Sequence, residues 1–191
     1  GWVIYADLNN NNQLDNGEAQ ATTDNSGAYT LNYLPMGVTY IIREVPQAGW
    51  MGVYPISGMY SIPVTAGTLA KKTDFGNFKL WSVNGFKFND LNANHRKDAN
   101  ESYLQGWTVS ISGGSGGTQQ VLTDANGYYS FGNLGPGKFT LTEVMQNGWI
   151  QTLHPAVITA KSGTNYVNKL FGNKIRGPKE TNPNMYSNFT N

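Results

Sequence analysis

The sequence predicts an all-β protein made of two tandem β-sandwich modules. Short runs that alternate apolar and polar residues, such as 128–131 and 139–142, lie between turns rich in Gly and Pro. This period of two is typical of strands with one buried face. An ordered set of motifs also occurs twice, which indicates an internal duplication. The composition, with 23 Gly, 8 Pro and 13% aromatic residues, agrees with a strand-rich chain.

The repeated motifs predict the domain boundaries. Each copy has an acidic loop, a Thr-Asp-x-x-Gly turn, a Pro/Gly turn, an alternating strand ending in Glu-Val, a Gly-Trp pair and a closing Phe-Gly-Asn. Asp-x-x-Gly before an alternating run is a tight hairpin turn. We predict one module over residues 1–79 and a second over 80–176. Residues 177–191 lack periodicity and are predicted to form a tail or linker.

Composition excludes several classes of function. The net charge is +1, without a basic stripe that would bind nucleic acid. The absence of Cys excludes disulfides and thiolate zinc sites. No apolar run approaches the roughly 18 residues needed to enter a membrane as a helix. His95 and His154 have no Ser or Asp arrangement around them that suggests a triad, so we predict no enzyme. The strand-like start at residues 1–5 indicates a piece of something longer.

Two acidic loops have the ligand spacing of a twelve-residue calcium loop, with oxygen-bearing side chains at positions 1, 3, 5, 9 and 12. Position 7 contributes a backbone carbonyl in such loops. These loops contain six of the twelve acidic residues. The predicted Ca²⁺ ligands are Asp7, Asn9, Asn11, Gln13, Asp15 and Glu18 in the first loop, and Asp90, Asn92, Asn94, Arg96, Asp98 and Glu101 in the second.

We predict a structural role for the ion and tighter binding in the first loop. The flanking segments are strands, so the loops are not expected to act as opening sensors. His95, Arg96 and Lys97 place positive charge beside the second set of ligands and should weaken cation binding. His95 would also need a left-handed backbone conformation. Three carboxylates held close together repel one another unless a cation lies between them.

The two copies differ in length between the loop and the Thr-Asp turn. Residues 102–123 separate these motifs in the second copy and include a predicted hairpin, whereas only residues 19–23 do so in the first. The first module is therefore predicted to lack about one strand. Either it closes as a smaller sandwich, or a strand from another chain pairs with its open edge.

Together these motifs resemble the calcium-binding B repeats of serine–aspartate-repeat surface adhesins, over roughly residues 2 to 175. The resemblance implies a prealbumin-like, immunoglobulin-like sandwich related to the B domains of collagen adhesins. The chain departs from the family pattern at Asn12 and His95, where Gly is usual, and at residues 99–100. The second loop departs most from the pattern.

The resemblance implies an extracellular, cell-surface or secreted structural protein. We expect a subunit of a surface assembly such as a filament, sheath or layer, with itself as partner. A stalk that does not assemble, and an adhesin that binds a host or surface protein or glycan, are the alternatives. Asn188 lies in a glycosylation sequon within the predicted tail.

In the collagen-adhesin relatives, a Glu matching Glu44 and Glu143 promotes an amide crosslink between a Lys and an Asn, here Asn77 or Asn173. The crosslink requires Lys on the inward face of the first strand. Alternation with Phe86 and Phe88 predicts Lys87 on the opposite face, so we expect no crosslink.

Overall fold

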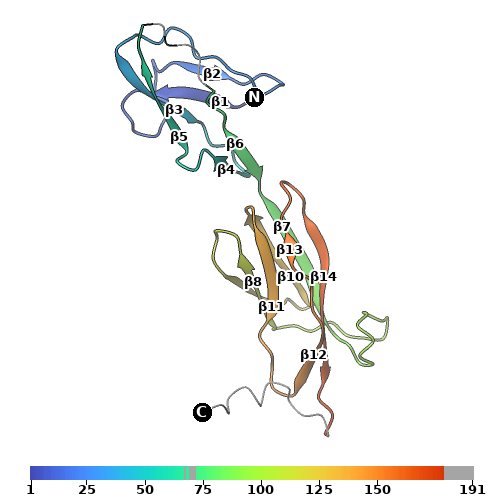
Figure 1. Ribbon diagram of the computed structural model, residues 1–191. Coiled ribbons are helices and arrows are strands. Elements are labelled where there is room, and N and C mark those ends of the chain that lie inside the picture. Colours follow the sequence, from blue (N-terminus) through green and yellow to red (C-terminus); the bar gives the residue numbers. More distant parts are fainter. Residues whose placement is uncertain (67, 69–71, 179–191) are drawn as a thin grey trace, which may run out of the picture. The chain divides into compact units, whose positions relative to one another are not determined.

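The computed structural model describes residues 1–66, 68 and 72–178, and this part of the chain forms strands without helices. Across these residues no helix is long and apolar enough to cross a membrane. The chain divides into two compact units, Gly1–Lys79 and Leu80–Asn191 (Figure 1). Most of the predicted tail, including Asn188, lies outside the described residues.

The second unit is a sandwich of two four-stranded sheets. One has the order β10-β7-β14-β12 and the other the order β13-β11-β8-β9. All neighbours are antiparallel except β7 and β14, which are parallel. Its strands are β7 (Trp81–Asn89), β8 (Thr108–Gly113), β9 (Gln119–Leu122), β10 (Tyr128–Leu134), β11 (Lys138–Glu143), β12 (Trp149–Leu153), β13 (Ile158–Thr159) and β14 (Tyr166–Ile175).

The core of this unit lies between the sheets. Val109 and Ile111 of β8 and Leu141 of β11 are buried, as the alternation of these strands predicts. The Trp81 ring of β7 meets the Phe139 ring of β11 edge to face, with centroids 5.0 Å apart. This contact joins the two sheets directly. The all-β, immunoglobulin-like sandwich predicted from the sequence is confirmed.

The first unit has fewer strands in the described residues. A four-stranded sheet has the order β2-β1-β3-β5, and a two-stranded sheet is formed by β4 and β6. The strands are β1 (Val3–Asp7), β2 (Gln20–Thr22), β3 (Val38–Glu44), β4 (Trp50–Tyr54), β5 (Met59–Val64) and β6 (Gly76–Lys79). Its core cluster contains Ile4, Ala6, Tyr40 and Ile42.

Strand β1 takes the position that β8, not β7, has in the second unit. Ile4 pairs with Glu44 and Ala21, as Val109 pairs with Glu143 and Val121. The larger sheet of the first unit therefore reproduces the order β13-β11-β8-β9 as β5-β3-β1-β2. The sequence predicts instead that β1 corresponds to β7, because a similar loop follows both strands.

Within the described residues, the first unit thus has no counterpart of β7. Strand β6 pairs with β4 in the way that β14 pairs with β12. The two pairs have the same register and the same register shift. In the second unit β14 also pairs with β7. Within the described residues, no strand pairs with the other edge of β6. Residues 29–34, which correspond to β10, are not in a strand, because the partner of β10 is β7.

Candidate functional site

Both twelve-residue loops fold around the carboxylate of their first residue. Asp7 is 1% exposed and accepts hydrogen bonds from the backbone N–H groups of Asn11 and Asn12, at 3.1 and 2.9 Å. Asp90 is fully buried and accepts the same two bonds from Asn94 and His95, at 3.0 and 3.1 Å. Each buried carboxylate therefore organises the first half of its loop.

The last residue of each loop closes the second half. Glu18 accepts hydrogen bonds from the N–H groups of Leu8 and Asp15, at 2.8 and 3.0 Å. Glu101 accepts the matching bonds from Leu91 and Asp98, at 2.8 and 2.9 Å. These contacts explain why a Glu is present at position 12 of both loops. Turn chemistry alone would not require it.

Three polar side chains converge inside each loop. Asn9 and Asn11 donate their amides to one oxygen of Asp15, at 2.8 and 2.7 Å. In the second loop, Asn92 and Asn94 donate to Asp98, at 3.0 and 2.8 Å. The backbone N–H groups of Gln13 and Arg96 bind Asn11 and Asn94, both at 2.9 Å. The structure thus brings positions 3, 5 and 9 of each loop together.

The backbone of both loops enters the left-handed region at positions 4 and 6. The φ angles are 56° and 66° at Asn10 and Asn12, and 54° and 68° at Ala93 and His95. The left-handed conformation expected for His95 is present. Asn and His tolerate this region better than most residues other than Gly.

Arg43 distinguishes the first loop from the second. Its Nε lies 2.8 Å from Oδ2 of Asp7, and its guanidinium also donates to Asn10 at 2.7 Å. Burial works against ionisation of Asp7, but the hydrogen bonds from Asn12 and Arg43 outweigh it, so its pKa lies below the usual value. The corresponding residue of β11 is Thr142, but β11 pairs with β8 and not with β7, the strand that leads into the second loop. Arg43 is far from the loop in sequence, and no local motif indicated it.

The donor set of the loops suits a hard cation, because carboxylate and amide oxygens are the ligands that Ca²⁺ prefers. In the described part of the chain, no three His, Cys, Asp or Glu side chains lie close enough together to hold a metal ion. The Asn side chains supply the remaining donors. Calcium binding, and the ranking of the two loops, remain predictions.

A second polar cluster lies inside the second unit. Lys87 is fully buried, and its Nζ lies 2.8 Å from Oε2 of Glu143, whose side chain is 1% exposed. The angles at this pair do not make a hydrogen bond. The Nζ also lies 4.3 Å from the centroid of the Trp107 ring. A buried Lys–Glu pair is costly in a protein core, which makes a chemical role worth testing.

The prediction that Lys87 faces away from the core is wrong. The buried residues Trp81, Val83 and Gly85 alternate along β7, and Lys87 continues their face. Phe86, on the other face, contacts the rings of Tyr103 and Tyr128, with centroids 5.3 and 5.4 Å away. Phe88 is buried there too and bridges to Tyr103. The segment after the loop covers this face at Phe86 and Phe88, so both faces of β7 are covered at its end and the alternation gave the wrong face for Lys87.

Asn173 is a further buried polar residue, on the strand next to β7. It is fully buried on β14, the strand parallel to β7, in a register that places Phe171 beside Lys87. Asn173 lies two residues further, on the same face as Phe171. Its Oδ1 has no hydrogen-bond partner, and its Nδ2 lies 3.8 Å from Sδ of Met145. Glu143 reaches the cluster from the opposite sheet, and its Oε1 accepts a 2.6 Å bond from Gln151.

Electrostatics at this pair shift the amine of Lys87 toward its neutral form. Burial lowers the pKa of Lys87 to about 8, although the neighbouring Glu143 acts in the opposite direction. Burial, with a smaller contribution from Glu143, raises the pKa of Tyr129. An uncharged amine is a nucleophile, whereas an ammonium group is not.

The Asp residues of the Thr-Asp turns and the Trp residues of the Gly-Trp pairs have structural roles. Asp24 and Asp124 each accept backbone hydrogen bonds within their turns, from Ser26 and Ala28 and from Asn126 and Tyr128 respectively. Trp50 and Trp149 pack edge to face against Trp2 and Trp107, with centroids 5.5 and 5.4 Å apart. Turn formation and core packing account for these residues.

Comparison with protein families matches residues 82–173 to the SdrD B-like domain. The second unit is an SdrD B-like domain. The resemblance drawn from the motifs is therefore confirmed there, and the SdrD B-like domain contains both Lys87 and the second loop. The match does not extend to the first unit, for which the same assignment remains a prediction.

The whole chain also resembles larger proteins. It is 25% identical to Colossin-A of Dictyostelium discoideum over 98% of the chain, but spans only 2% of that protein. Among solved structures, it resembles the Bacillus anthracis TIE protein (22% identity, 92% of this chain, 31% of that chain, TM-score 0.42). The minor pilin GBS52 of Streptococcus agalactiae gives 13% identity, 95% and 85% coverage, and a TM-score of 0.40. At these scores, neither structure informs the function of the chain.

Proposed function

We propose that this chain is part of an extracellular surface protein with a structural role, whose SdrD B-like domain is closed by a covalent bond between Lys87 and Asn173. The observation that carries the proposal is the buried Lys87–Glu143 pair, with the buried Asn173 on the strand next to β7. A buried lysine, a buried carboxylate and an amide oxygen without a hydrogen-bond partner each lower the stability of a sandwich. A reaction between the lysine and the amide would explain why they are found in the core.

The reaction is an amide exchange. The neutral Nζ of Lys87 attacks Cγ of Asn173, and Glu143 accepts the amine proton and returns a proton to the leaving nitrogen. A C–N bond to Lys87 forms, the bond from Cγ to Nδ2 breaks, and ammonia leaves. The product is a neutral amide in place of a buried charge, and it ties the first strand of the domain to the last.

Intact-mass measurement tests this step. Wild-type protein should be lighter than its sequence by one ammonia, and a digest should contain a peptide branched between Lys87 and Asn173. Glu143→Gln should keep the full mass, because the proton acceptor is removed. A full mass in the wild-type protein would contradict the proposal.

We further propose that the two loops bind Ca²⁺ as a structural ion. The matched hydrogen-bond networks and the oxygen donors of both loops support this. Extracellular calcium modules bind at about 10⁻⁴–10⁻³ M, which agrees with a location outside the cell. The expected result is a lower melting temperature after chelation, restored by Ca²⁺ but not by Mg²⁺. An unchanged melt would exclude a structural ion.

An assembling subunit and a stalk that does not assemble are the two finer roles, and among the described residues no strand pairs with the outer edge of β6. Open strand edges bind other strands in many assemblies. Size-exclusion chromatography and negative-stain imaging of the chain distinguish the two. Filaments or oligomers support assembly, whereas a monodisperse monomer supports the stalk, the alternative role.

A further inference from the structure

The second loop has three consecutive basic residues, His95, Arg96 and Lys97, which we call the basic tip. His95 and Arg96 are exposed and Lys97 is half-buried. Among the described residues none of the three forms an ion pair, although the same loop contains three carboxylates. Those carboxylates accept hydrogen bonds from donors within the loop. The loop therefore keeps its negative charge inside and presents basic side chains to solvent.

The basic tip is not needed to fold such a loop. The first loop has the same hydrogen bonds to its first and last residues. At the positions that match the basic tip it has Asn12, Gln13 and Leu14, which are uncharged. Basic side chains beside the ligands also weaken the binding of a cation. Since neither the loop fold nor calcium binding requires the basic tip, a partner outside the loop explains it better.

Aromatic side chains border the basic tip. The Nζ of Lys97 lies 4.7 Å from the centroid of the Tyr103 ring and donates a 2.8 Å hydrogen bond to the carbonyl of Asp98. These two contacts hold the ammonium group in place. Tyr103 is 44% exposed, and its ring packs against Phe86, which also contacts Tyr128. A fixed positive charge therefore adjoins a partly exposed aromatic surface.

This combination indicates the chemistry of the partner. Arg and Lys bind carboxylate and sulfate groups through charge-assisted hydrogen bonds, and the guanidinium of Arg can donate two in parallel. An exposed aromatic ring provides an apolar surface against which the C–H groups of a sugar can pack. An acidic polysaccharide has acid groups and sugar rings along the same chain, so it can contact the basic tip and Tyr103 together.

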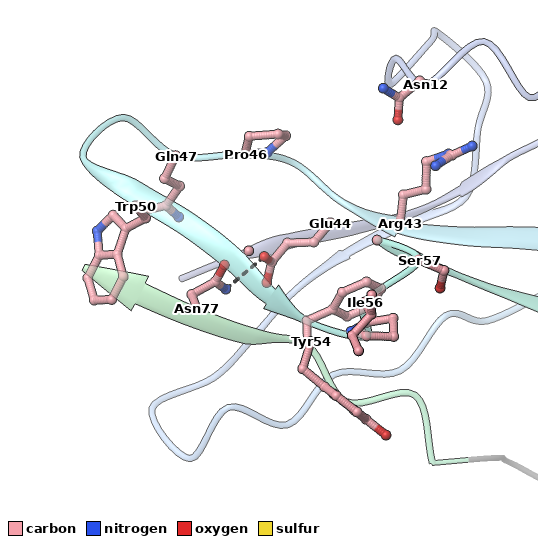
Figure 2. A pocket seen from close by; sticks show the side chains of 14 residues that line it. Asn12, Arg43, Glu44, Pro46, Gln47, Trp50, Tyr54, Ile56, Ser57 and Asn77 are labelled. Atoms are coloured by element: carbon pink, nitrogen blue, oxygen red, sulfur yellow. Dashed lines mark hydrogen bonds between the residues drawn. The ribbon is translucent and has the colours of Figure 1, made fainter. Parts of the chain in front are cut away.

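Other negatively charged partners fit less well. Nucleic acids and anionic membranes are bound by longer basic grooves or clusters, whereas Asp98 directly follows the basic tip. A second copy of the chain offers few free carboxylates. Asp7 is paired with Arg43, and Glu44 accepts the amide of Asn77, which Figure 2 shows. The other loop carboxylates accept hydrogen bonds within their own loops.

We propose that the basic tip and the Tyr103 ring form a binding site for an acidic polysaccharide. Arg96 and Lys97 bind its acid groups, and Tyr103 packs against a neighbouring sugar ring. The site lies within the SdrD B-like domain. It adds a ligand to the structural role proposed above and requires no bond between Lys87 and Asn173.

The test uses the intact chain in buffer with Ca²⁺, so that the state of the loop does not limit binding. Titration calorimetry compares dextran sulfate, hyaluronan and neutral dextran. One or both of the acidic polymers should bind, more weakly as salt is raised, and neutral dextran should not. Binding of dextran sulfate alone would identify sulfate as the acid group, and binding of hyaluronan alone would identify carboxylate. If neither acidic polymer binds, or if single-stranded DNA binds as tightly, the proposal is wrong.

Variants locate the site. Arg96→Gln combined with Lys97→Gln should weaken binding about tenfold or more, because charge-assisted contacts are lost. Lys138→Gln combined with Lys161→Gln removes the same charge from exposed positions and should change the affinity by less than about twofold. Equal losses in the two double variants would show attraction to net charge alone and contradict a site.

Tyr103→Leu tests the aromatic part of the site. It keeps an apolar side chain but removes the ring, and should weaken binding by about threefold or more without a change in the response to salt. An unchanged affinity would remove Tyr103 from the site. The mass of the chain and its response to chelation are measured separately, so failure to bind a polysaccharide leaves the proposed function standing.

Discussion

The two units share their motifs but differ in how they fill one position of the sandwich. In the second unit β7 carries Lys87 between β10 and β14, and in the first this position is an open groove beside β6. Both units contain a Glu at the matching strand position, an Asn on the matching strand, an edge-to-face Trp pair and a Tyr that donates to a backbone carbonyl. The comparison teaches that the groups around β7 are a shared feature of the two units and do not belong to the second unit alone.

The loops differ in a complementary way. Asp7 has an arginine partner, whereas no Lys or Arg among the described residues forms an ion pair with Asp90. The first loop therefore has part of its negative charge neutralised by the protein. We expect this to reverse the order of calcium affinity that the sequence predicts, because a fixed cation competes with a bound one.

The largest effect should come from removing the nucleophile of the second unit. Lys87→Met should restore the full mass and lower the stability of that unit by about 5 kcal/mol, the loop-closure value for a link spanning most of a domain. Calorimetry of the intact chain measures this, with the transition of the first unit as a reference. Lys161→Met, at an exposed turn, is the matched control. A variant as stable as wild type would contradict a crosslink.

Arg43→Thr removes the cation beside the first loop, so that Asp7, like Asp90, has no ion pair among the described residues. Without divalent ions it should destabilise the first unit by about 3 kcal/mol, since Asp7 is left buried without its partner. Added Ca²⁺ should stabilise the Arg43→Thr variant by more than it stabilises the wild-type protein. Denaturant unfolding in chelator and in Ca²⁺ measures both. An equal response to Ca²⁺ in both proteins would show that Arg43 does not compete with the ion.

The pH dependence of an uncrosslinked second unit should reveal its lysine. In Asn173→Ala the amine stays free, with a pKa of about 8 when folded against 10.5 ordinarily. Between these values the unfolded chain binds more protons, so stability should rise with pH, by up to roughly 3 kcal/mol. Unfolding curves from pH 7 to 11 measure this. The double variant with Lys87→Met should lack the rise.

The smallest effect concerns the last residue of each loop. Glu18→Gln and Glu101→Gln each keep one acceptor but lose the charge, and should cost about 1 kcal/mol without calcium. The rise in melting temperature on adding Ca²⁺ should then be smaller than in the wild-type protein. The loss of this rise should be larger for Glu101→Gln than for Glu18→Gln. A larger decrease for Glu18 would favour the order predicted from the sequence.

Much of the fold was accessible from the sequence, because alternation and turn residues act locally. The strands around residues 128–143 and the twin loops with His95 in the left-handed region follow from short-range rules. The position of β1 was not accessible, because register depends on long-range partners and the loop that follows β1 resembles the one after β7.

Lys87 was misassigned since Phe86 and Phe88 are covered from outside by Tyr103 and Tyr128. Arg43 depends on a contact across the sheet that no motif encodes.

Strands β7 and β14 lie side by side and parallel, one entering the second unit and the other leaving it. Tension between the chain ends therefore loads this pair in shear. A bond from Lys87 to Asn173 would carry the force directly from one strand to the other, and residues 88–172 would be bypassed. In single-molecule pulling, the second unit should then add no length at any force that leaves the backbone intact, and Lys87→Met should restore its extension.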